Sequence, residues 1–180
     1  MVFHPSSFQI FRCSIDAKKR SMSFQGAIAL TLDAKGRLAI PARHREPLAA
    51  ALAGRESATT DAGGLILTAH PHKCLLLYPE PAWTPIRDRI LKAPSFDVRS
   101  AALKRVLIGN AREEAMDSAG RLLIAPELRE FAGLERKVWM VGLGSHFELW
   151  SDAGWQAQNA AAVEVLQSAE PPAGFEDFAL

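Results

Sequence analysis

One sequence pattern occurs twice in this chain, and this repeat constrains the fold more than any other feature. DAKGRLAIPARHRE at 33–46 returns as DSAGRLLIAPELRE at 117–130, with identical residues at half of the positions. A shorter pair of blocks, LYPEPAW at 77–83 and LWSDAGW at 149–155, follows with a smaller spacing. Self-similarity of this kind predicts two copies of one structural unit.

The strand and turn that open the first copy can be predicted from alternation. Ile28, Leu30 and Leu32 alternate with smaller or polar residues, which indicates a half-buried strand. DAKG at 33–36 is typical of a turn, because an aspartate at its first position can accept bonds from the backbone and glycine tolerates positive φ.

A short strand and a helical segment should follow that turn. Leu38 and Ile40 are expected to point inward and Arg37 to the opposite face. Pro41 should end the strand and open a helical turn that stops near Pro47, with PLAAALAG as a second short helix. The polar, glycine-bounded segment 54–64 is predicted to be a loop.

The remainder of each copy predicts two more strands and a helix. In the first copy these are LILTAH, KCLLLYP, a helix from Pro79 that buries Trp83, Ile86 and Ile90, and a further helix with Leu103, Val106 and Leu107 on one face. The second copy begins with the strands AREEAMD and RLLI and a short helix from Pro126 to Gly133. The strands KVWMVGLG and HFELW come next, followed by a helix at 152–167 with Trp155, Val163 and Leu166 on one face.

Each copy is too small to close a core by itself. We therefore expect an α+β fold in which two repeats, 23–108 and 109–168, pack as partners about a pseudo-twofold axis. Residues 1–22 are expected to be disordered, or to reflect a start codon assigned upstream of Met22, and 169–180 to form a flexible acidic tail.

Charge differs between the two copies although their patterns agree. Residues 23–108 hold 12 Lys and Arg against 7 Asp and Glu, whereas 109–180 hold 5 against 12. This asymmetry indicates that the first copy meets a polyanion, unless it is random drift of surface charge. Two cysteines, Cys13 and Cys74, do not predict a disulfide framework, and a reduced compartment fits best.

The repeated motif resembles a known family. A strand followed by D-x-x-G-R, a hydrophobic residue, x-I-P and a short helix with an arginine resembles the AbrB-like swapped-hairpin β-barrel domain. Two tandem copies, beginning with FQGAIALTLDAKGRLAIPARHR and containing CLLLYPEPAW and FELWSDAGW, resemble the MraZ family from about residue 22 to 166. Its D-x-x-x-R motif falls on Asp33 and Arg37, and on Asp117 and Arg121.

The resemblance implies a bacterial transcriptional regulator in the cytoplasm, associated with the nucleoid. It would repress the gene cluster for division and cell-wall synthesis, and hence its own gene, by binding short direct repeats in double-stranded DNA. It would assemble into a homo-oligomeric ring, an octamer or a dodecamer, with no cofactor, metal, membrane or small-molecule partner. Ala125 departs from the pattern, since Pro41 occupies that place in the first copy, and can shift the helical turn that carries Arg129.

The residues themselves indicate the same chemistry. Lys35, Arg37, Arg43 and Arg45 are four cations close together in the sequence, expected to form a compact patch that meets phosphates. Arg37 can also grip guanine with two hydrogen bonds. Alternatively, or in addition, Arg37 pairs with Asp33 to pin the hairpin around Gly36.

The second copy lacks most of this patch. Ala119, Glu127 and Leu128 stand where the first copy has Lys35, Arg43 and His44. We therefore expect Asp117, Gly120 and Arg121 to be structural, with Arg121 at an interface between chains.

Three other interpretations compete with this one. His70, His72 and Cys74 alternate and can share a strand face as zinc ligands, but Pro71 lies between them and no fourth ligand is evident. The sequence contains no phosphate-binding glycine loop and no G-x-S-x-G, which argues against an enzyme. An AbrB-like scaffold or antidote module that acts through protein partners is the main alternative. Trp83, Trp139, Trp150 and Trp155 are expected in the core or at interfaces.

Overall fold

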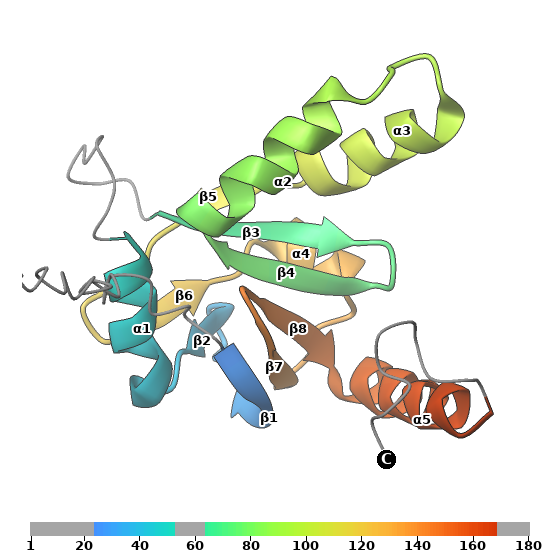
Figure 1. The fold of residues 1–180 in the computed structure, drawn as a ribbon. Helices are drawn as coiled ribbons and strands as arrows, with labels where there is room; N and C mark the ends of the chain where they lie inside the picture. Colours follow the sequence, from blue (N-terminus) through green and yellow to red (C-terminus); the bar gives the residue numbers. More distant parts are fainter. Residues whose placement is uncertain (1–23, 53–63, 169–180) are drawn as a thin grey trace, which may run out of the picture.

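The computed structural model describes residues 24–52 and 64–168 (Figure 1). The predictions for the N-terminal extension, for most of the polar loop at 54–64 and for the acidic tail lie outside these residues. Within them, both repeats show the predicted order of strand, strand, helix, strand, strand, helix.

The first repeat comprises β1 (Phe24–Thr31), β2 (Arg37–Ala39), α1 (Ala42–Leu52), β3 (Leu65–His70), β4 (Cys74–Pro79), α2 (Glu80–Lys92), α3 (Val98–Leu103) and the π-helical turn η1 (Lys104–Ile108). The second comprises β5 (Arg112–Glu114), β6 (Arg121–Leu123), α4 (Pro126–Phe131), β7 (Lys137–Gly144), β8 (Phe147–Ser151) and α5 (Asp152–Ser168).

Strands of the two repeats are interleaved in one sheet. A six-stranded sheet has the order β1-β7-β8-β4-β3-β5, and β2 and β6 form a separate two-stranded ribbon. All pairings are antiparallel, so the first strand of the first repeat pairs with the third strand of the second, β7, while β5 pairs with β3 of the first. Exchanging equivalent strands returns the same order read backwards. The structure therefore confirms the α+β class and the two tandem repeats.

The register places the pseudo-twofold axis. In the ribbon, Leu38 pairs with Leu122, its equivalent in the second copy of the longer repeated block. In the sheet, Leu76 pairs with Glu148, and these two residues directly precede the shorter repeated block in each copy. Near each repeated block, two equivalent residues from the two copies thus pair on the axis. The different sequence spacings of the longer and the shorter block therefore do not disturb the symmetry.

The main core lies between the ribbon and one face of the sheet. Leu38, Ile40, Leu122 and Ile124 of the ribbon segment are fully buried, as predicted for the two in the first repeat. They share one cluster with four fully buried side chains of β4 and β8: Leu75, Leu77, Phe147 and Leu149.

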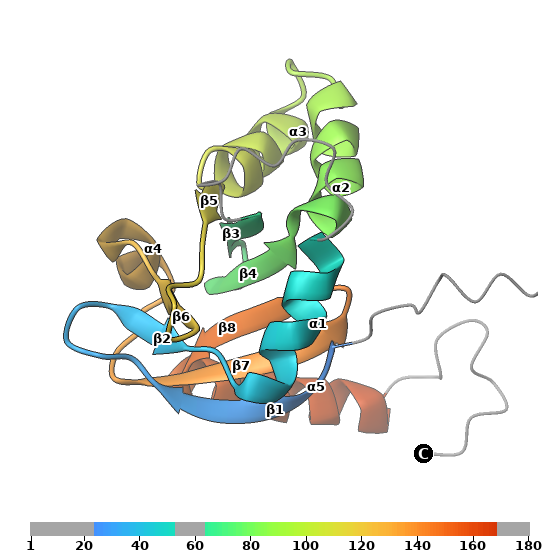
Figure 2. The same ribbon diagram turned by 90° about the vertical axis from the view of Figure 1, so that its left-hand side faces the viewer.

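A second cluster covers the other face of the sheet. Trp83 and Ile90 of α2 pack there with Tyr78, Trp150 and Leu107 of η1. Figures 1 and 2 show α2 and α3 over β3 and β4, whereas α5 lies at the opposite end, beside β7 and β8.

Three helical details differ from the predictions. The segment after β2 is a single helix, α1, that runs through Pro47. His44 and Leu48 are both buried and share one face of α1, so their packing outweighs the one hydrogen bond that Pro47 cannot donate. Leu103 is 40% exposed, and Val163 and Leu166 are 47% and 55% exposed, so these predicted faces are not buried within the chain.

Leu38→Ala and Leu122→Ala should each lower the free energy of unfolding by about 2–5 kcal/mol, because each empties a fully buried site on the axis. Since the two residues pair across the ribbon, the double variant should differ from the sum by roughly 0.5–3 kcal/mol. Urea denaturation measures the three values. Leu123→Ala, in the same strand but 48% exposed, is the control, and strict additivity at the axis would contradict a shared site.

Candidate nucleic-acid interface

The outward face of the β2–β6 ribbon carries two arginines. Leu38 and Leu122 point into the core, so their neighbours in each strand point away from it. The register pairs Arg37 with Leu123 and Ala39 with Arg121. Arg37 and Arg121 therefore lie diagonally on one face, on either side of the axis. The structure brings together two residues to which the sequence suggested different roles.

Each arginine is fixed by the aspartate four residues before it. Asp33 Oδ1 accepts the backbone N–H groups of Lys35 and Arg37 at 2.9 and 2.9 Å. Its Oδ2 accepts Arg37 Nε at 2.8 Å. Asp117 accepts the equivalent backbone bonds, and its Oδ2 lies 2.7 Å from both Nε and Nη2 of Arg121. The pinned hairpin considered as an alternative is therefore present in both repeats.

These bonds leave the guanidinium groups accessible. The side chains of Arg37 and Arg121 are 28% and 38% exposed. Backbone N–H donation from the arginine, with the side-chain bond and its charge, holds the pKa of Asp33 and Asp117 below the usual range. In each turn, the aspartate thus holds the arginine side chain in place with its positive charge exposed on the outward face of the ribbon. DNA contact by Arg37 remains a prediction.

Arg45 and Arg129 hold the ribbon to the opposite turn. Arg45 Nε donates to the Ile40 carbonyl at 2.7 Å, and Arg129 Nε to that of Ile124 at 3.1 Å. The Arg45 side chain also covers Gly120, so closely that a Cβ there would overlap its guanidinium. Arg129 covers Gly36 in the same way.

Arg45 thus has a structural role that the sequence analysis missed. The available signal was that the second copy carries an arginine at the equivalent position, Arg129, although it lacks counterparts of Lys35 and Arg43. The equivalent bonds of Arg45 and Arg129 also show that Ala125 in place of Pro41 does not shift the second helical turn. Glycine is required at 36 and 120 because φ is +79° and +73° there.

Lys35 and Arg43 lie at opposite ends of the ribbon. Gly36 O accepts the N–H of Ile124, which places the Lys35 turn beside the start of α4. Gly120 O accepts the N–H of Ile40, which places the second turn beside the start of α1, where Arg43 lies. The predicted patch is therefore extended along the ribbon, with Arg37 and Arg121 between its ends, and is not compact.

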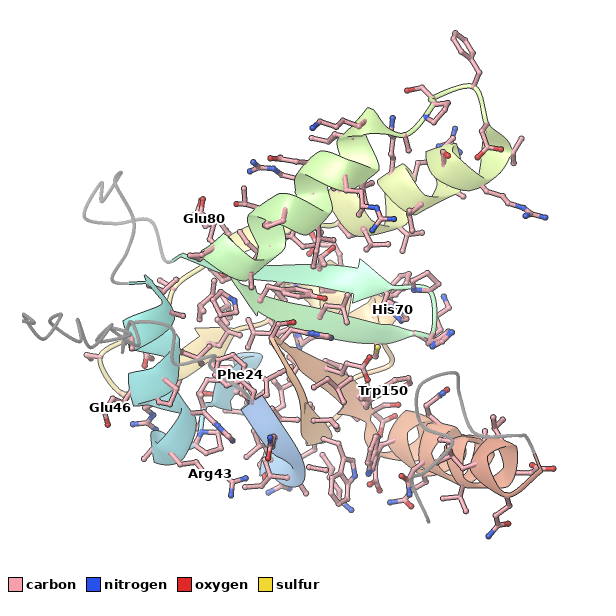
Figure 3. The ribbon with its side chains drawn as sticks, in the orientation of Figure 1. Phe24, Arg43, Glu46, His70, Glu80 and Trp150 are labelled. Carbon is pink, nitrogen blue, oxygen red and sulfur yellow. The ribbon has the colours of Figure 1, made fainter. Side chains whose placement is uncertain are left out.

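The ribbon's ends differ in charge between the repeats. Lys35 and Arg43 are exposed, and Figure 3 shows Arg43 directed away from the core. Glu127 stands in the place equivalent to Arg43 and lies 3.6 Å from Arg112, measured between Oε2 and Nη2. The two arginines make the charge on the ribbon face nearly symmetric about the axis. The residues at the two ends of the ribbon break this symmetry.

His44 supports Arg43 from within the core. Its ring is 8% exposed and lies 4.9 Å from the Phe147 ring and 6.4 Å from that of Phe24, between centroids. Burial, and secondarily the charge of Arg43, lowers its pKa. The neutral ring can accept the bond from Arg43 Nε to Nε2, at 3.1 Å.

The histidines and cysteine considered as zinc ligands do not form such a site. The rings of His70 and His72 meet edge to face at 4.7 Å between centroids. Cys74 is buried, which raises the pKa of its thiol to about 12. Within 24–52 and 64–168, no group of three or more His, Cys, Asp or Glu could hold a metal ion.

Two of the four tryptophans lie in the core as predicted, whereas Trp139 and Trp155 are half-buried. Trp83 and Trp150 are buried, and Trp139 donates its indole N–H to Asp152 at 2.7 Å.

Of the helices described, none has the length and apolar character needed to cross a membrane.

Comparison with known proteins also divides the chain into two tandem units. The family described as "MraZ protein, putative antitoxin-like" matches the chain twice, over 23–106 and 107–173. The chain belongs to the MraZ family. Three similar relatives are each named "Transcriptional regulator MraZ": those of Dechloromonas aromatica (strain RCB), Aromatoleum aromaticum and Azoarcus sp. (strain BH72) are 62%, 59% and 53% identical. Each alignment covers 87% of this chain and 99% of the relative.

His44→Leu should reduce the loss of stability on acidification. Since the native pKa of His44 lies below its unfolded value, the unfolded chain binds the proton more readily, and stability falls as the pH drops through about 6.5. Leucine, which the second repeat carries as Leu128, removes this contribution. Urea midpoints at about pH 7 and pH 5 measure the decline. A decline as steep as in the wild type would show that His44 contributes nothing to it.

Gly120→Ala should cost about 2 kcal/mol, because positive φ strains alanine and its Cβ displaces Arg45 from the Ile40 carbonyl. Gly133→Ala is the control, since φ is +59° there but nothing lies within 4 Å. It should cost about 1 kcal/mol, as strain alone does. Equal losses in denaturation would mean that the contact with Arg45 does not matter.

Proposed function

We propose that this chain is a sequence-specific DNA-binding transcriptional regulator that represses the division and cell-wall gene cluster and its own gene. It binds short direct repeats upstream of that cluster as a homo-oligomeric ring, an octamer or a dodecamer, on the chromosome in the cytoplasm. Membership of a family whose members are named transcriptional regulators supports the general activity.

The main observation behind the proposal is that the outward face of the ribbon presents two arginines, each held in place by an aspartate. Arginine binds guanine O6 and N7 with two hydrogen bonds, and fixing Nε on Asp33 or Asp117 reduces the flexibility lost on binding. A two-stranded ribbon fits the major groove. We assign base contacts to Arg37 and Arg121 and phosphate contacts to the exposed Lys35 and Arg43.

The asymmetric ribbon ends favour direct repeats over palindromes. With Lys35 and Arg43 on one repeat only, each chain reads DNA in one direction. Copies related by rotation around a ring present that direction in the same sense, so they fit sites repeated head to tail. Several sites engaged at once multiply a weak individual affinity.

The alternative is a scaffold or antidote module that acts through protein partners. The acidic second repeat supports it, since it can dock a basic protein. Selective, salt-dependent DNA binding would exclude a purely protein-binding role.

Fluorescence anisotropy on DNA from upstream of the chain's own gene tests the proposal. Arg37→Ala should weaken binding about tenfold or more and reduce selectivity over scrambled DNA. Arg121→Ala should act in the same way. Lys35→Ala should weaken both DNAs alike and lower the salt slope by about one.

Arg89→Ala is the control, because Arg89 is exposed on α2, on the other face of the sheet. Light scattering confirms the oligomeric state of each variant. Wild-type protein that shows no preference for the upstream DNA, even at low salt, would overturn the regulator and support the scaffold. If Arg37→Ala bound the DNA as well as the wild type does, the DNA-binding surface would have to lie elsewhere on the protein.

A further inference from the structure

The outward face of the β2–β6 ribbon carries one large apolar side chain beside its arginines. Leu123 is 48% exposed, whereas Arg37, directly opposite it, is half-buried. The other two residues of this face in the paired strands are Ala39 and Arg121. Leu123 therefore lies exposed on the face to which we assign the base contacts.

The bond between Arg37 and Asp33 helps to leave this leucine uncovered. Arg37 Nε donates to Asp33 Oδ2 at 2.8 Å, so the guanidinium is held beside the turn and does not extend across the opposite strand. Leucine has no polar atom with which to bind a phosphate or a base edge. The ribbon thus presents a cation and an apolar group next to each other, each with its own possible contact.

The register places these two groups on neighbouring base pairs. Directly opposite residues of an antiparallel pair have Cβ atoms about 4.5–5.5 Å apart. Successive base pairs of B-DNA lie about 3.4 Å apart along the helix axis. A major groove that offers a guanine to Arg37 therefore presents a nearby base pair to Leu123.

Thymine is the base that suits an apolar side chain at that place. In the major groove, guanine, adenine and cytosine present hydrogen-bond donors and acceptors, and thymine also presents its C5 methyl group. A leucine placed against donors and acceptors removes their water without replacing its hydrogen bonds, which costs free energy. Contact with the methyl group removes apolar surface from water and is favourable. A leucine on this face therefore distinguishes thymine from the other bases.

The equivalent residue of the first repeat provides a comparison within the chain. Ala39 lies opposite Arg121 as Leu123 lies opposite Arg37, so the two pairs are related by the pseudo-twofold axis. The methyl group of alanine ends close to the strand, and the leucine side chain extends further. One side of the axis thus offers an arginine and a leucine, and the other offers an arginine and only a methyl group.

We propose that Leu123 is a specificity-determining residue that contacts the C5 methyl group of a thymine near the base bound by Arg37. Single exposed leucines are common on protein surfaces and most need no explanation. This leucine differs because DNA bound across Arg37 and Arg121 covers it, so its contact is either favourable or penalised. The inference deepens the DNA-binding proposal and rests on the ribbon being the surface that meets DNA.

DNA without the methyl group tests this contact. Amplifying the upstream region with deoxyuridine triphosphate instead of thymidine triphosphate removes the C5 methyl groups and keeps every base-pairing group. In fluorescence anisotropy, the wild type should bind the uracil DNA about fourfold or more weakly, because burial of one methyl-sized group contributes a factor of about that size. Leu123→Ala should bind the thymine DNA more weakly than the wild type does and bind the two DNAs with equal affinity.

Leu91→Ala is the matched control. Leu91 is 51% exposed and belongs to α2, which lies over the other face of the sheet (Figure 1). This variant should keep the wild-type ratio of affinities for the two DNAs. Neither substitution empties a buried site, and circular dichroism and light scattering verify the fold and the mass of each variant.

Replacing single thymines by uracil locates the contact. The sensitive thymine should lie close to the guanine whose replacement removes the effect of Arg37→Ala. A sensitive thymine far from that guanine overturns the assignment, because the register places Leu123 beside Arg37.

The outcomes separate this inference from the DNA-binding proposal. If the wild type prefers upstream to scrambled DNA but binds its thymine and uracil forms equally, only the methyl contact is overturned. The contact is also overturned if Leu123→Ala keeps the wild-type ratio, since another group then reads the methyl. A changed mass of Leu123→Ala places Leu123 between copies of the chain and overturns it as well. A wild type with no preference for the upstream DNA overturns both proposals.

Discussion

The fold depends on strand pairing between the two halves of the chain. β1 and β5 each find their hydrogen-bonded neighbour in the other repeat, and Leu38 meets Leu122 at the centre of the ribbon. The apolar face of either repeat is completed by side chains from its sister. The ribbon and the sheet therefore form together, and the face of the ribbon draws one arginine from each repeat.

The Asp-Arg turn combines anchoring and display. A carboxylate accepts two backbone N–H groups and a guanidinium N–H, which fixes the hairpin and leaves the rest of the arginine on the surface. A second arginine, Arg45 or Arg129, braces the glycine of the opposite turn. Two arginines per repeat thus have different positions and different roles, although the sequence presents them as similar cations.

The sequence predicted local features well because they follow from local chemistry. Alternation located β1, and the aspartate and glycine of the turn located the hairpin of Asp33 and Arg37. The repeat predicted the symmetry. The strand exchange was implied only by resemblance to a family, because alternation shows that a face is buried but not which strand buries it.

Features that depend on distant contacts were predicted less well. Pro47 was expected to stop a helix, but burial of His44 and Leu48 sustains α1. Four cations close in sequence were expected to cluster, yet the ribbon's register separates Lys35 from Arg43 and places Arg121 beside Arg37. That arrangement arises from pairing between the two repeats, which no local pattern reports.

The exchange of strands also constrains the order of events during synthesis. Phe24 pairs with Gly144, so β1 leaves the ribosome long before its partner strand is complete. At the usual pace of translation, that interval is roughly 6–24 s. Throughout it β1 lacks the strand with which it pairs. Because a neighbouring nascent chain on the same message offers an identical β7, chains translated in close succession have a geometrically equivalent route to exchange halves with each other.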